Sequence, residues 1–401
     1  MKAVILAAGE GTRLRPFTAS EPKVMIPVAN RPILEYVVES LIENGIRDIV
    51  MVVGYRRQRI MSYFGDGDDF GADIEYVVQK KQPPHGGTAH ALYQAKEKID
   101  DDFIVLPGDN VVSKNTISDL LEDITPPALL ITRSDSPSKY GVVTLKKGKK
   151  EIDNLIEKPE ESPSHLISTG IYSFTPKIFD YIDESMKERK YDLPSVVQKK
   201  MEDKEIRAIK TEATWIDAVY PWDLLHVNSV ALGDMEKRIN GLIGENVIIK
   251  GDVKIGEGTR IRGGTFIEGP AVIGEGCDIG PNACILPSTS IGDNAKIEPF
   301  TKVQNSVVMN GVQIGTNSTI ENTVIGEGVR IGNNFSTFIS DARVQGDDGF
   351  HEVREIGTMI AEDTEIDSGV IVEPGVIIGK NCEIRYGRTI RENIESEAKA
   401  I

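Results

Sequence analysis

Long apolar runs are absent from this sequence of 401 residues. No stretch approaches the roughly 18 consecutive apolar residues of a transmembrane helix, and the apolar start, MKAVILAAGEG, is too short for a signal peptide. Basic residues are also in deficit, with 46 Lys and Arg against 62 Asp and Glu and a net charge of −16. A nucleic-acid-binding surface needs a basic patch, so this balance argues against one. We expect a cytoplasmic protein without a nucleic-acid or membrane partner.

Cysteine is scarce as well, being limited to Cys277, Cys284 and Cys382. Three cysteines cannot all pair, and their spacing is not that of metal ligands. This usage fits a reducing compartment in which the three residues serve as small apolar core residues. A chain of this length exceeds what one hydrophobic core usually holds, so we expect two domains.

The first domain, residues 1–230, alternates between strand-like and helix-like segments. Its strands are short apolar segments, namely Lys2 to Leu6, Asp48 to Val53, a strand ending near Val78, and Phe103 to Leu106. Asn30 is placed to cap a helix with apolar residues at helical spacing over 33–42, and a further helix is predicted through Ala89 to Ala95. This order predicts an α/β fold with a Rossmann-like, mostly parallel sheet. Ligands of such sheets bind outside the carboxyl ends of the strands.

The second half repeats an aliphatic residue at every sixth position. The unbroken run comprises Ile243, Ile249, Ile255, Ile261, Ile267, Ile273, Ile279, Ile285, Ile291, Ile297 and Val303. The phase shifts by one at Val308, and after an insert the repeat resumes at Ile360. A triangular coil of short parallel strands has this period, with one inward aliphatic residue on each side. The pattern predicts a left-handed parallel β-helix over residues 243–385.

Three segments lack the repeat. We expect a helical linker at 231–242 and a polar loop insert at about 340–355. The charge-rich tail, 386–401, is predicted to form a short helix.

The loop after the first strand, LAAGEGTRLRPFT, suits phosphate binding. Gly9 and Gly11 allow the backbone to approach a phosphate closely enough for several N–H groups to point at it. Arg13 offers a fork of donors, and Lys23 a compact positive charge. We therefore predict a polyphosphate site.

The same residues carry a resemblance to a family. The run LAAGEGTRLRPFT…EPKVMIPV…RPIL, Leu6 to Leu34, resembles the signature of sugar-1-phosphate nucleotidylyltransferases. Further motifs recur in the family's order: GGTAHAL at 86–92, PGDN at 107–110, YGVV at 140–143, EKP at 157–159, STGIY at 168–172 and WIDAVYPWDLL at 215–225. The overall layout is similar to archaeal bifunctional enzymes that join this transferase to an amino-sugar acetyltransferase.

The resemblance implies a role for each matching residue. The residues expected to bind the nucleotide are Leu6, Ala8, Gly9, Gly11, Thr12, Gln79, Gly87 and Thr88. Those expected to bind the sugar phosphate are Gly141, Glu157, Lys158 and Thr169. Asp109 and Asp217 would bind Mg²⁺, and Arg13 and Lys23 would be the catalytic cations. Asp109 also follows an apolar strand, where a carboxylate can hold Mg²⁺ against phosphate oxygens.

The base is read by a residue that offers a donor and an acceptor together. Gln79 can do so toward a pyrimidine edge, with Gln82 as the alternative. His85 and His90 are interpreted as loop and helix residues, not as acids or bases. GTAHA looks more like the uridylyl enzymes that act on N-acetylglucosamine 1-phosphate than like the dTTP-using group. This resemblance favours UTP over dTTP and implies N-acetylglucosamine 1-phosphate or glucose 1-phosphate as the sugar substrate. A thymidylyltransferase acting on glucose 1-phosphate is the alternative.

Two readings of the coil compete. The family resemblance implies a trimer, or a multiple of a trimer, that binds acetyl-CoA in the grooves between subunits and acetylates an amino sugar. The matching stretch, QIGTNSTIENTVIG at 313–326, contains no histidine, and the only histidine of this half is His351 in the insert. The physical reading therefore favours a scaffold for homo-oligomer assembly.

Overall fold

The computed structural model describes residues 1–80, 86–203, 205–233, 235–346 and 348–400. These residues form two compact units. The first comprises Met1–Glu10 and Ile33–Ile216, and the second comprises Gly11–Pro32 and Asp217–Ile401. The second unit therefore contains most of the predicted phosphate loop together with the coil.

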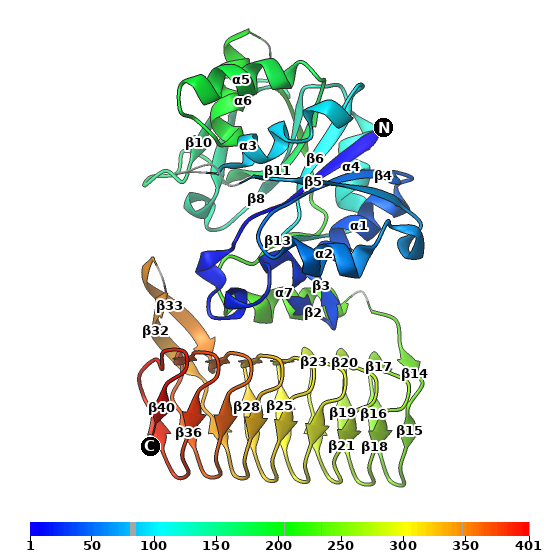
Figure 1. Ribbon diagram of the computed structural model, residues 1–401, viewed down its shortest axis with the longest axis vertical. Coiled ribbons are helices and arrows are strands. Elements are labelled where there is room, and N and C mark those ends of the chain that lie inside the picture. The colour runs from blue at the N-terminus through cyan, green and yellow to red at the C-terminus, as the bar shows by residue number, and fades with distance from the viewer. Residues whose placement is uncertain (81–85, 204, 234, 347, 401) are drawn as a thin grey trace. The chain divides into compact units, whose positions relative to one another are not determined.

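A nine-stranded sheet forms the centre of the first unit (Figure 1). Its strands are β1 (Lys2–Ala7), β4 (Asp48–Val53), β5 (Asp73–Val78), β6 (Phe103–Pro107), β8 (Ala128–Arg133), β9 (Gly141–Leu145), β10 (Ile152–Glu157), β11 (Leu166–Phe174) and β12 (Arg207–Lys210). The order is β10-β9-β11-β6-β1-β4-β5, with β8 joining β11 to β12. Because β1 pairs in parallel with both β4 and β6, the Rossmann-like prediction is confirmed.

The helices of this unit pack their apolar residues against the sheet. They are α1 (Ile33–Glu43), α2 (Arg57–Phe64), α3 (Thr88–Tyr93), α4 (Lys114–Glu122), α5 (Ile178–Lys187) and α6 (Leu193–Asp203), with 3-10 turns η4 (Asp68–Phe70), η5 (Lys96–Lys98) and η6 (Pro137–Lys139). A short pair joins β7 (Asn110–Val112) to β13 (Trp215–Asp217). Among the described residues, no helix has the length and apolar character needed to cross a membrane.

The strand order reverses beside β1. After β1 the chain builds β4 and β5 on one side, and β6 then returns to the other side. The register pairs Leu6 with Pro107, so the two strands end level. A parallel α/β sheet opens a crevice at such a reversal, outside the carboxyl ends of the strands.

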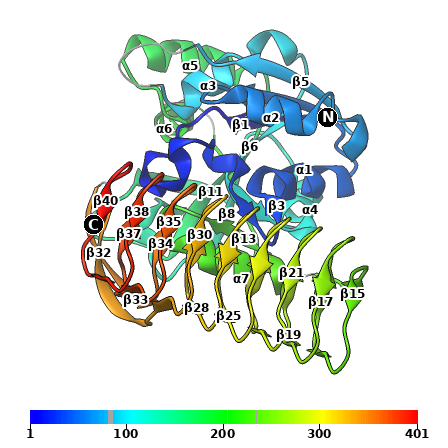
Figure 2. The same ribbon diagram turned by 60° about the horizontal axis from the view of Figure 1, so that its bottom comes forward.

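Three parallel sheets form the coil of the second unit (Figure 2). The first coil sheet contains β14 (Arg238–Ile239), β17 (Val253–Ile255), β20 (Ala271–Ile273), β23 (Thr289–Ile291), β26 (Val307–Val308), β29 (Val324–Ile325), β34 (Met359–Ile360) and β37 (Ile377–Ile378). The second contains β15 (Leu242–Ile243), β18 (Arg260–Ile261), β21 (Asp278–Ile279), β24 (Lys296–Ile297), β27 (Gln313–Ile314), β30 (Arg330–Ile331), β35 (Glu365–Ile366), β38 (Glu383–Ile384) and β40 (Lys399–Ala400). The third contains β16 (Ile248–Lys250), β19 (Phe266–Glu268), β22 (Cys284–Ile285), β25 (Lys302–Gln304), β28 (Thr319–Glu321), β31 (Ser336–Thr337), β36 (Ile371–Val372) and β39 (Thr389–Ile390).

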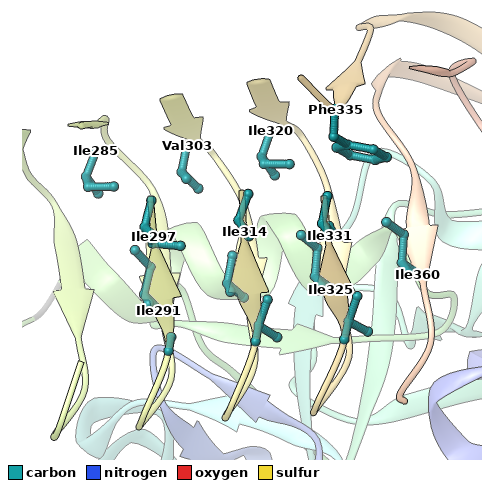
Figure 3. Close-up of a cluster of buried hydrophobic side chains, with 14 of the residues drawn as sticks. Ile285, Ile291, Ile297, Val303, Ile314, Ile320, Ile325, Ile331, Phe335 and Ile360 are labelled. Carbon is teal, nitrogen blue, oxygen red and sulfur yellow. The ribbon is translucent and has the colours of Figure 1, made fainter. Parts of the chain in front are cut away.

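The residues of the six-residue repeat fill the inside of the coil (Figure 3). Ile291 pairs with Val308 and Val308 with Ile325, so the ladder stays in register across the shift in phase. Each of these two turns of the coil is one residue shorter than the turns before them. The shortening occurs at the corner where the chain passes from the third coil sheet to the first. The left-handed β-helix is confirmed, and the second shift, at Ile325, is an addition to the predicted pattern.

The insert leaves the coil at that same corner, between β31 and β34 (Figure 1). It is not a loop, as expected, but an antiparallel hairpin of β32 (Ser340–Gly346) and β33 (Gly349–Ile356). Its alternation of polar and apolar residues is compatible with a strand, but the polar composition concealed this.

One helix and one short hairpin cover the outer face of the first coil sheet. They are α7 (Asp223–Gly233) and the pair β2 (Pro27–Val28) and β3 (Arg31–Pro32). Ala29, Leu232 and Val272 form a buried apolar cluster there. Asn228 accepts a hydrogen bond from the Ala29 N–H at 2.8 Å and donates one to the Ser288 carbonyl at 3.0 Å.

Three local predictions need correction. The expected linker is helical only to Gly233, because β14 and β15 already pair as coil strands. The tail is not helical, since β39 and β40 extend the coil, with Lys399 opposite Glu383. Asn30 does not cap α1. It has a φ of 62° after β2, and its amide donates to the Ile291 carbonyl at 2.6 Å.

Truncation of one inward residue tests the packing of the coil. Ile297→Ala should lower the free energy of unfolding by about 2–5 kcal/mol, because it leaves a cavity in a close-packed interior. Its neighbour Lys296 faces outward on the same strand, so Lys296→Ala should change this quantity by less than about 0.5 kcal/mol. Urea titration followed by circular dichroism measures both, and equal losses would contradict the assigned orientation of β24.

Candidate active site

The chain that leaves β1 is held close to the turn after β4. The Ala8 carbonyl accepts a hydrogen bond from the Tyr55 N–H at 3.2 Å. A Cβ atom at Gly54 would lie 2.7 Å from that carbonyl oxygen, so glycine is required there. A Cβ atom at Gly9, by contrast, would meet no heavy atom within 4 Å. Packing within the described structure therefore does not explain Gly9.

The turn after β6 lies against the same strand end. The Gly108 N–H donates to the Leu6 carbonyl at 2.9 Å, and a Cβ atom at Gly108 would lie 3.2 Å from that oxygen. Asp109 follows and is partly buried. Beside it, the Oδ1 atom of Asn110 is buried without a hydrogen-bond partner in the described structure. The end of β6 thus presents a carboxylate and an unsatisfied amide oxygen together.

These oxygens have the chemistry of a magnesium site. Mg²⁺ usually takes one or two protein carboxylates and completes its shell with water and substrate phosphates. No group of three or more His, Cys, Asp or Glu side chains suited to a metal occurs within the described ranges. The donor set at Asp109 therefore fits an ion that is shared with a phosphorylated substrate, not an ion held in a cage of protein ligands.

Gln79 follows β5 and is oriented by a histidine. Its Nε2 atom lies 3.0 Å from Nδ1 of His90, which is 7% exposed. Gln94 contacts the other ring nitrogen at 3.4 Å. The sequence prediction gave His90 no role in the site. Gln82 and His85 lie outside the described residues.

Gly87 and Thr88 have structural partners. A Cβ atom at Gly87 would lie 2.1 Å from the Tyr191 carbonyl oxygen. The same oxygen accepts hydrogen bonds from the N–H groups of Ala89 and His90. The Thr88 hydroxyl oxygen accepts a hydrogen bond from the Leu193 N–H at 2.9 Å. These contacts fasten the start of α3 to the segment before α6.

Residues of the predicted sugar subsite meet where β9, β10 and β11 adjoin. Gly141 pairs with Glu157, and a Cβ atom at Gly141 would lie 3.1 Å from Oε2 of Glu157 and 3.6 Å from Cβ of Ser168. Lys158, which is exposed, follows with its Nζ atom 4.0 Å from the Glu157 carboxylate. This edge offers an anionic and a cationic group side by side.

Thr169 lies at a bulge in β11 and faces inward. It is 2% exposed, and its hydroxyl donates to the Leu130 carbonyl at 2.7 Å. Its own carbonyl accepts a hydrogen bond from the indole of Trp215 at 3.1 Å. Burial, together with the charge of Glu157, raises the pKa of nearby Tyr172 to about 12, so that phenol remains protonated.

The second unit holds the remaining predicted residues: Gly11, Thr12, Arg13, Lys23 and Asp217. Gly11 has a φ of 66°, and a Cβ atom there would lie 2.7 Å from Cβ of Lys23. It begins η1 (Thr12–Leu14), which is followed by η2 (Phe17–Ala19) and η3 (Lys23–Met25). The Nζ atom of Lys23 lies 3.0 Å from Oδ1 of Asp217, with the two side chains 13% and 20% exposed. A cation and a carboxylate from distant parts of the chain are therefore paired.

A glycine-rich turn and a carboxylate that follow neighbouring strands at a reversal of strand order are typical of enzymes that bind nucleotides. A sequence profile of nucleotidyl transferases matches residues 2–231, and a profile of the GMPPB C-terminal domain matches residues 267–349.

Relatives extend the likeness over the whole chain. The bifunctional protein GlmU of Methanococcus vannielii is 34% identical, with 99% of this chain and 97% of the relative covered. A bifunctional sugar-1-phosphate nucleotidylyltransferase/acetyltransferase of Sulfurisphaera tokodaii is 33% identical, with 98% of each covered. A Bacillus anthracis structure provisionally assigned to glucose-1-phosphate thymidylyltransferase is 28% identical, with a TM-score of 0.54, and covers 60% of this chain and 98% of its own. The chain belongs to the family of sugar-1-phosphate nucleotidylyltransferases that carry a second, hexapeptide-repeat domain.

The two glycines of the loop form a matched pair for mutation. Gly11→Ala should destabilise the fold by about 1–2 kcal/mol, because an L-residue is strained at this φ and would also collide with Lys23. Gly9→Ala should cost less than about 0.5 kcal/mol, yet weaken nucleoside triphosphate binding on the order of tenfold by obstructing a hydrogen bond to phosphate. Urea titration and calorimetry measure the two effects. Unchanged binding in Gly9→Ala would remove Gly9 from the site.

Proposed function

We propose that this protein transfers a uridylyl group from UTP to N-acetylglucosamine 1-phosphate or glucose 1-phosphate and releases pyrophosphate. The observation that carries the proposal is the reversal of strand order beside β1, where Gly9 follows the end of β1 and Asp109 follows the end of its neighbour β6. The triphosphate would bind along the backbone after β1. Its α-phosphorus would then be attacked by a phosphate oxygen of the sugar phosphate.

Charge neutralisation is the main task, because both substrates are anions. Arg13 supplies a planar fork of donors suited to the leaving pyrophosphate. Lys23 supplies a point charge for the α-phosphate, and its pairing with Asp217 holds the ammonium in place before substrate binds. No enzyme nucleophile is required, since the acceptor phosphate is itself the nucleophile.

Mg²⁺ would be held by Asp109 and Asp217 together with the phosphates of the triphosphate, where it would withdraw charge from the reacting phosphate. The donor chemistry at the end of β6 supports this assignment. Asp109 would also orient the phosphate chain within the crevice, since it follows directly on a turn packed against Leu6.

The sugar phosphate would bind at the edge formed by Gly141, Glu157 and Lys158. Glu157 can accept hydrogen bonds from sugar hydroxyls, and Lys158 can pair with the anomeric phosphate. Gly141 leaves the space that the Glu157 carboxylate occupies. Thr169 would contribute through its main chain, because its hydroxyl is used inside the sheet.

The base would be read by Gln79. Its amide can offer a donor and an acceptor to the edge of uracil, and its contact with buried His90 restrains rotation of that amide. Thymine has the same hydrogen-bonding edge and differs by one methyl group. Discrimination between UTP and dTTP would therefore depend on the ribose and on the space beside the base.

A grid of substrates tests the reaction. We expect pyrophosphate release with Mg²⁺ and UTP that depends on the presence of a sugar 1-phosphate. UTP, dTTP, ATP and GTP are crossed with glucose 1-phosphate and N-acetylglucosamine 1-phosphate. Preference for dTTP would favour the thymidylyltransferase alternative, and no release with any pair would refute the proposal.

Two carboxylates, one at each end of β6, allow a matched comparison of variants in the same assay. Asp109→Ala should lower kcat on the order of 100-fold or more, because charge stabilisation in the transition state is lost. Asp101→Ala, at the opposite end of the strand, should leave kcat unchanged. Equal activity of the two variants would remove Asp109 from the site.

For the coil we propose assembly into a homo-oligomer, as a trimer or a multiple of one. A histidine base for acetyl transfer is not found within the coil strands. His351 lies in the hairpin, where its Nε2 atom is 2.8 Å from Oδ1 of Asp348. The scaffold proposal is supported by the lack of a histidine in the coil strands, although relatives that match the full chain are named as bifunctional.

An acetyl-transfer assay tests the scaffold assignment. Release of coenzyme A from acetyl-CoA in the presence of glucosamine 1-phosphate should not exceed the rate without protein, because the coil strands contain no histidine to act as a base. Release that depends on the protein and is lost in His351→Ala would instead assign acyl transfer to the hairpin. The mass of the assembly, measured by light scattering, tests the oligomer separately.

A further inference from the structure

The phosphate-loop segment, residues 11–32, belongs to the same compact unit as the coil and is hydrogen-bonded to it through Ser20 and Asn30. The Ser20 hydroxyl donates to Oε1 of Glu362, which is partly buried. The Asn30 side-chain amide donates to the Ile291 carbonyl at 2.6 Å. We call these two contacts the anchors of the loop. Lys23 lies between them in the chain.

The anchors are set apart by the ladder of the first coil sheet. Ile291 belongs to β23 and Glu362 follows β34, with β26 and β29 between these two strands. Neighbouring strands lie about 4.8 Å apart, so three steps of the ladder separate the anchors by roughly 14 Å along the coil. The chain from Ser20 to Asn30 would reach roughly 33 Å if it were extended. The anchors therefore hold this part of the loop in a folded path.

The position of Glu362 recurs on other turns of the coil, where its side chain serves the coil itself. Asp293 and Asn310 also follow the inward aliphatic residue of the first coil sheet by two positions. There Oδ1 of Asp293 accepts a hydrogen bond from the Glu275 N–H at 2.7 Å, and Oδ1 of Asn310 accepts one from the Asp293 N–H at 2.8 Å. The carboxylate of Glu362 is instead hydrogen-bonded to Ser20. This side chain therefore departs from the pattern of its column and contacts the loop.

The Ser20 anchor adjoins the turn that contains Arg13. Ser20 directly follows η2, and the buried Thr18 hydroxyl within η2 donates to the Gly11 carbonyl at 2.9 Å. The same carbonyl accepts a hydrogen bond from the Leu14 N–H at 3.0 Å. The turn is thus closed by its own hydrogen bonds and is connected to the coil through two residues of chain.

The Asn30 anchor lies beside a second attachment to the coil. Asn228 of α7 accepts a hydrogen bond from the Ala29 N–H at 2.8 Å and donates one to a coil carbonyl at 3.0 Å. Helix α7 follows Asp217, whose Oδ1 atom lies 3.0 Å from Nζ of Lys23. Both members of the Lys23–Asp217 pair therefore come from segments that are fixed to the first coil sheet.

We propose that Glu362 of the coil is a positioning residue for nucleotidyl transfer. With the Asn30 anchor, its hydrogen bond to Ser20 holds the phosphate-loop segment on the first coil sheet, so that Lys23 is directed at the α-phosphate. This inference rests on the proposed role of Lys23 in the transfer reaction. Glu362 acts through the loop and not on a substrate. The coil then supports the transferase of its own chain in addition to assembling copies of it.

Removal of the carboxylate tests the proposal. Glu362→Ala should lower kcat for pyrophosphate release about three- to tenfold, the effect of losing one hydrogen bond. Glu362→Gln retains an acceptor for the Ser20 hydroxyl and should restore most of this activity. The KM for the sugar phosphate should stay unchanged, because the proposed subsite for that substrate does not include the loop. A loss in Glu362→Gln equal to that in Glu362→Ala would contradict positioning through Ser20.

Double-mutant cycles separate positioning from general loosening of the coil. Ser20→Ala should give the same loss as Glu362→Ala, and the two changes together should cost no more than either alone. In a Lys23→Ala background, Glu362→Ala should have no further effect on kcat, because the group that it positions is gone. Glu365→Ala is the matched control, since Glu365 is exposed on the second coil sheet three residues further along. Additive losses, or an equal loss in the control, would overturn the proposal.

Hydrogen exchange gives a readout that does not require activity. The Met25 N–H, in the turn that contains Lys23, donates to the Pro22 carbonyl at 2.8 Å. It should exchange several-fold faster in Glu362→Ala than in the unmodified protein, whereas the N–H of Gly326, bonded within the coil at 2.7 Å, should not change. Unchanged exchange at Met25, or an equal increase at Gly326, would refute positioning by Glu362. Unmodified protein that releases no pyrophosphate, with exchange at Met25 still dependent on Glu362, would refute the proposed function alone.

Discussion

The register of the coil ladder constrains the rest of the structure. Each turn must return its aliphatic residues to the column below, so residues can be removed or inserted only at the corners. The shortened turns at Val308 and Ile325 and the hairpin all use one corner. The first coil sheet, beside that corner, accepts α7 and residues 27–32 on its outer face. The segment that contains most of the predicted phosphate loop is thereby attached to the β-helix.

This attachment matters because the protein is acidic and its substrates are anions. A net charge of −16 offers no general attraction, so a few cations must be held where phosphates react. Lys23 is held by Asp217. This pair lies within the unit that contains the coil. Rigid support for a cation reduces the reorganisation that transfer requires.

The sequence predicted the features that depend on residues close to one another in the chain. The six-residue period revealed the coil, and the apolar strand before Asp109 located the carboxyl end of β6 in the central sheet. Contacts between distant residues had no signal in the local sequence. Asn30 was predicted to cap a helix, but its amide donates a hydrogen bond to the Ile291 carbonyl. His90 was interpreted as a helix residue without a role in the site, but it contacts the side-chain amide of Gln79. The charged tail resembled a helix because outward positions of the coil are also charged, as Lys399 and Glu383 are.

The hairpin combines a misleading local sequence with contacts between residues that are distant in the chain. Its sequence is polar and breaks the repeat, which is typical of a surface loop, yet its tip packs on Tyr220 and Trp222. An insertion at a corner leaves the inward column intact, so it can change without loss of the coil core.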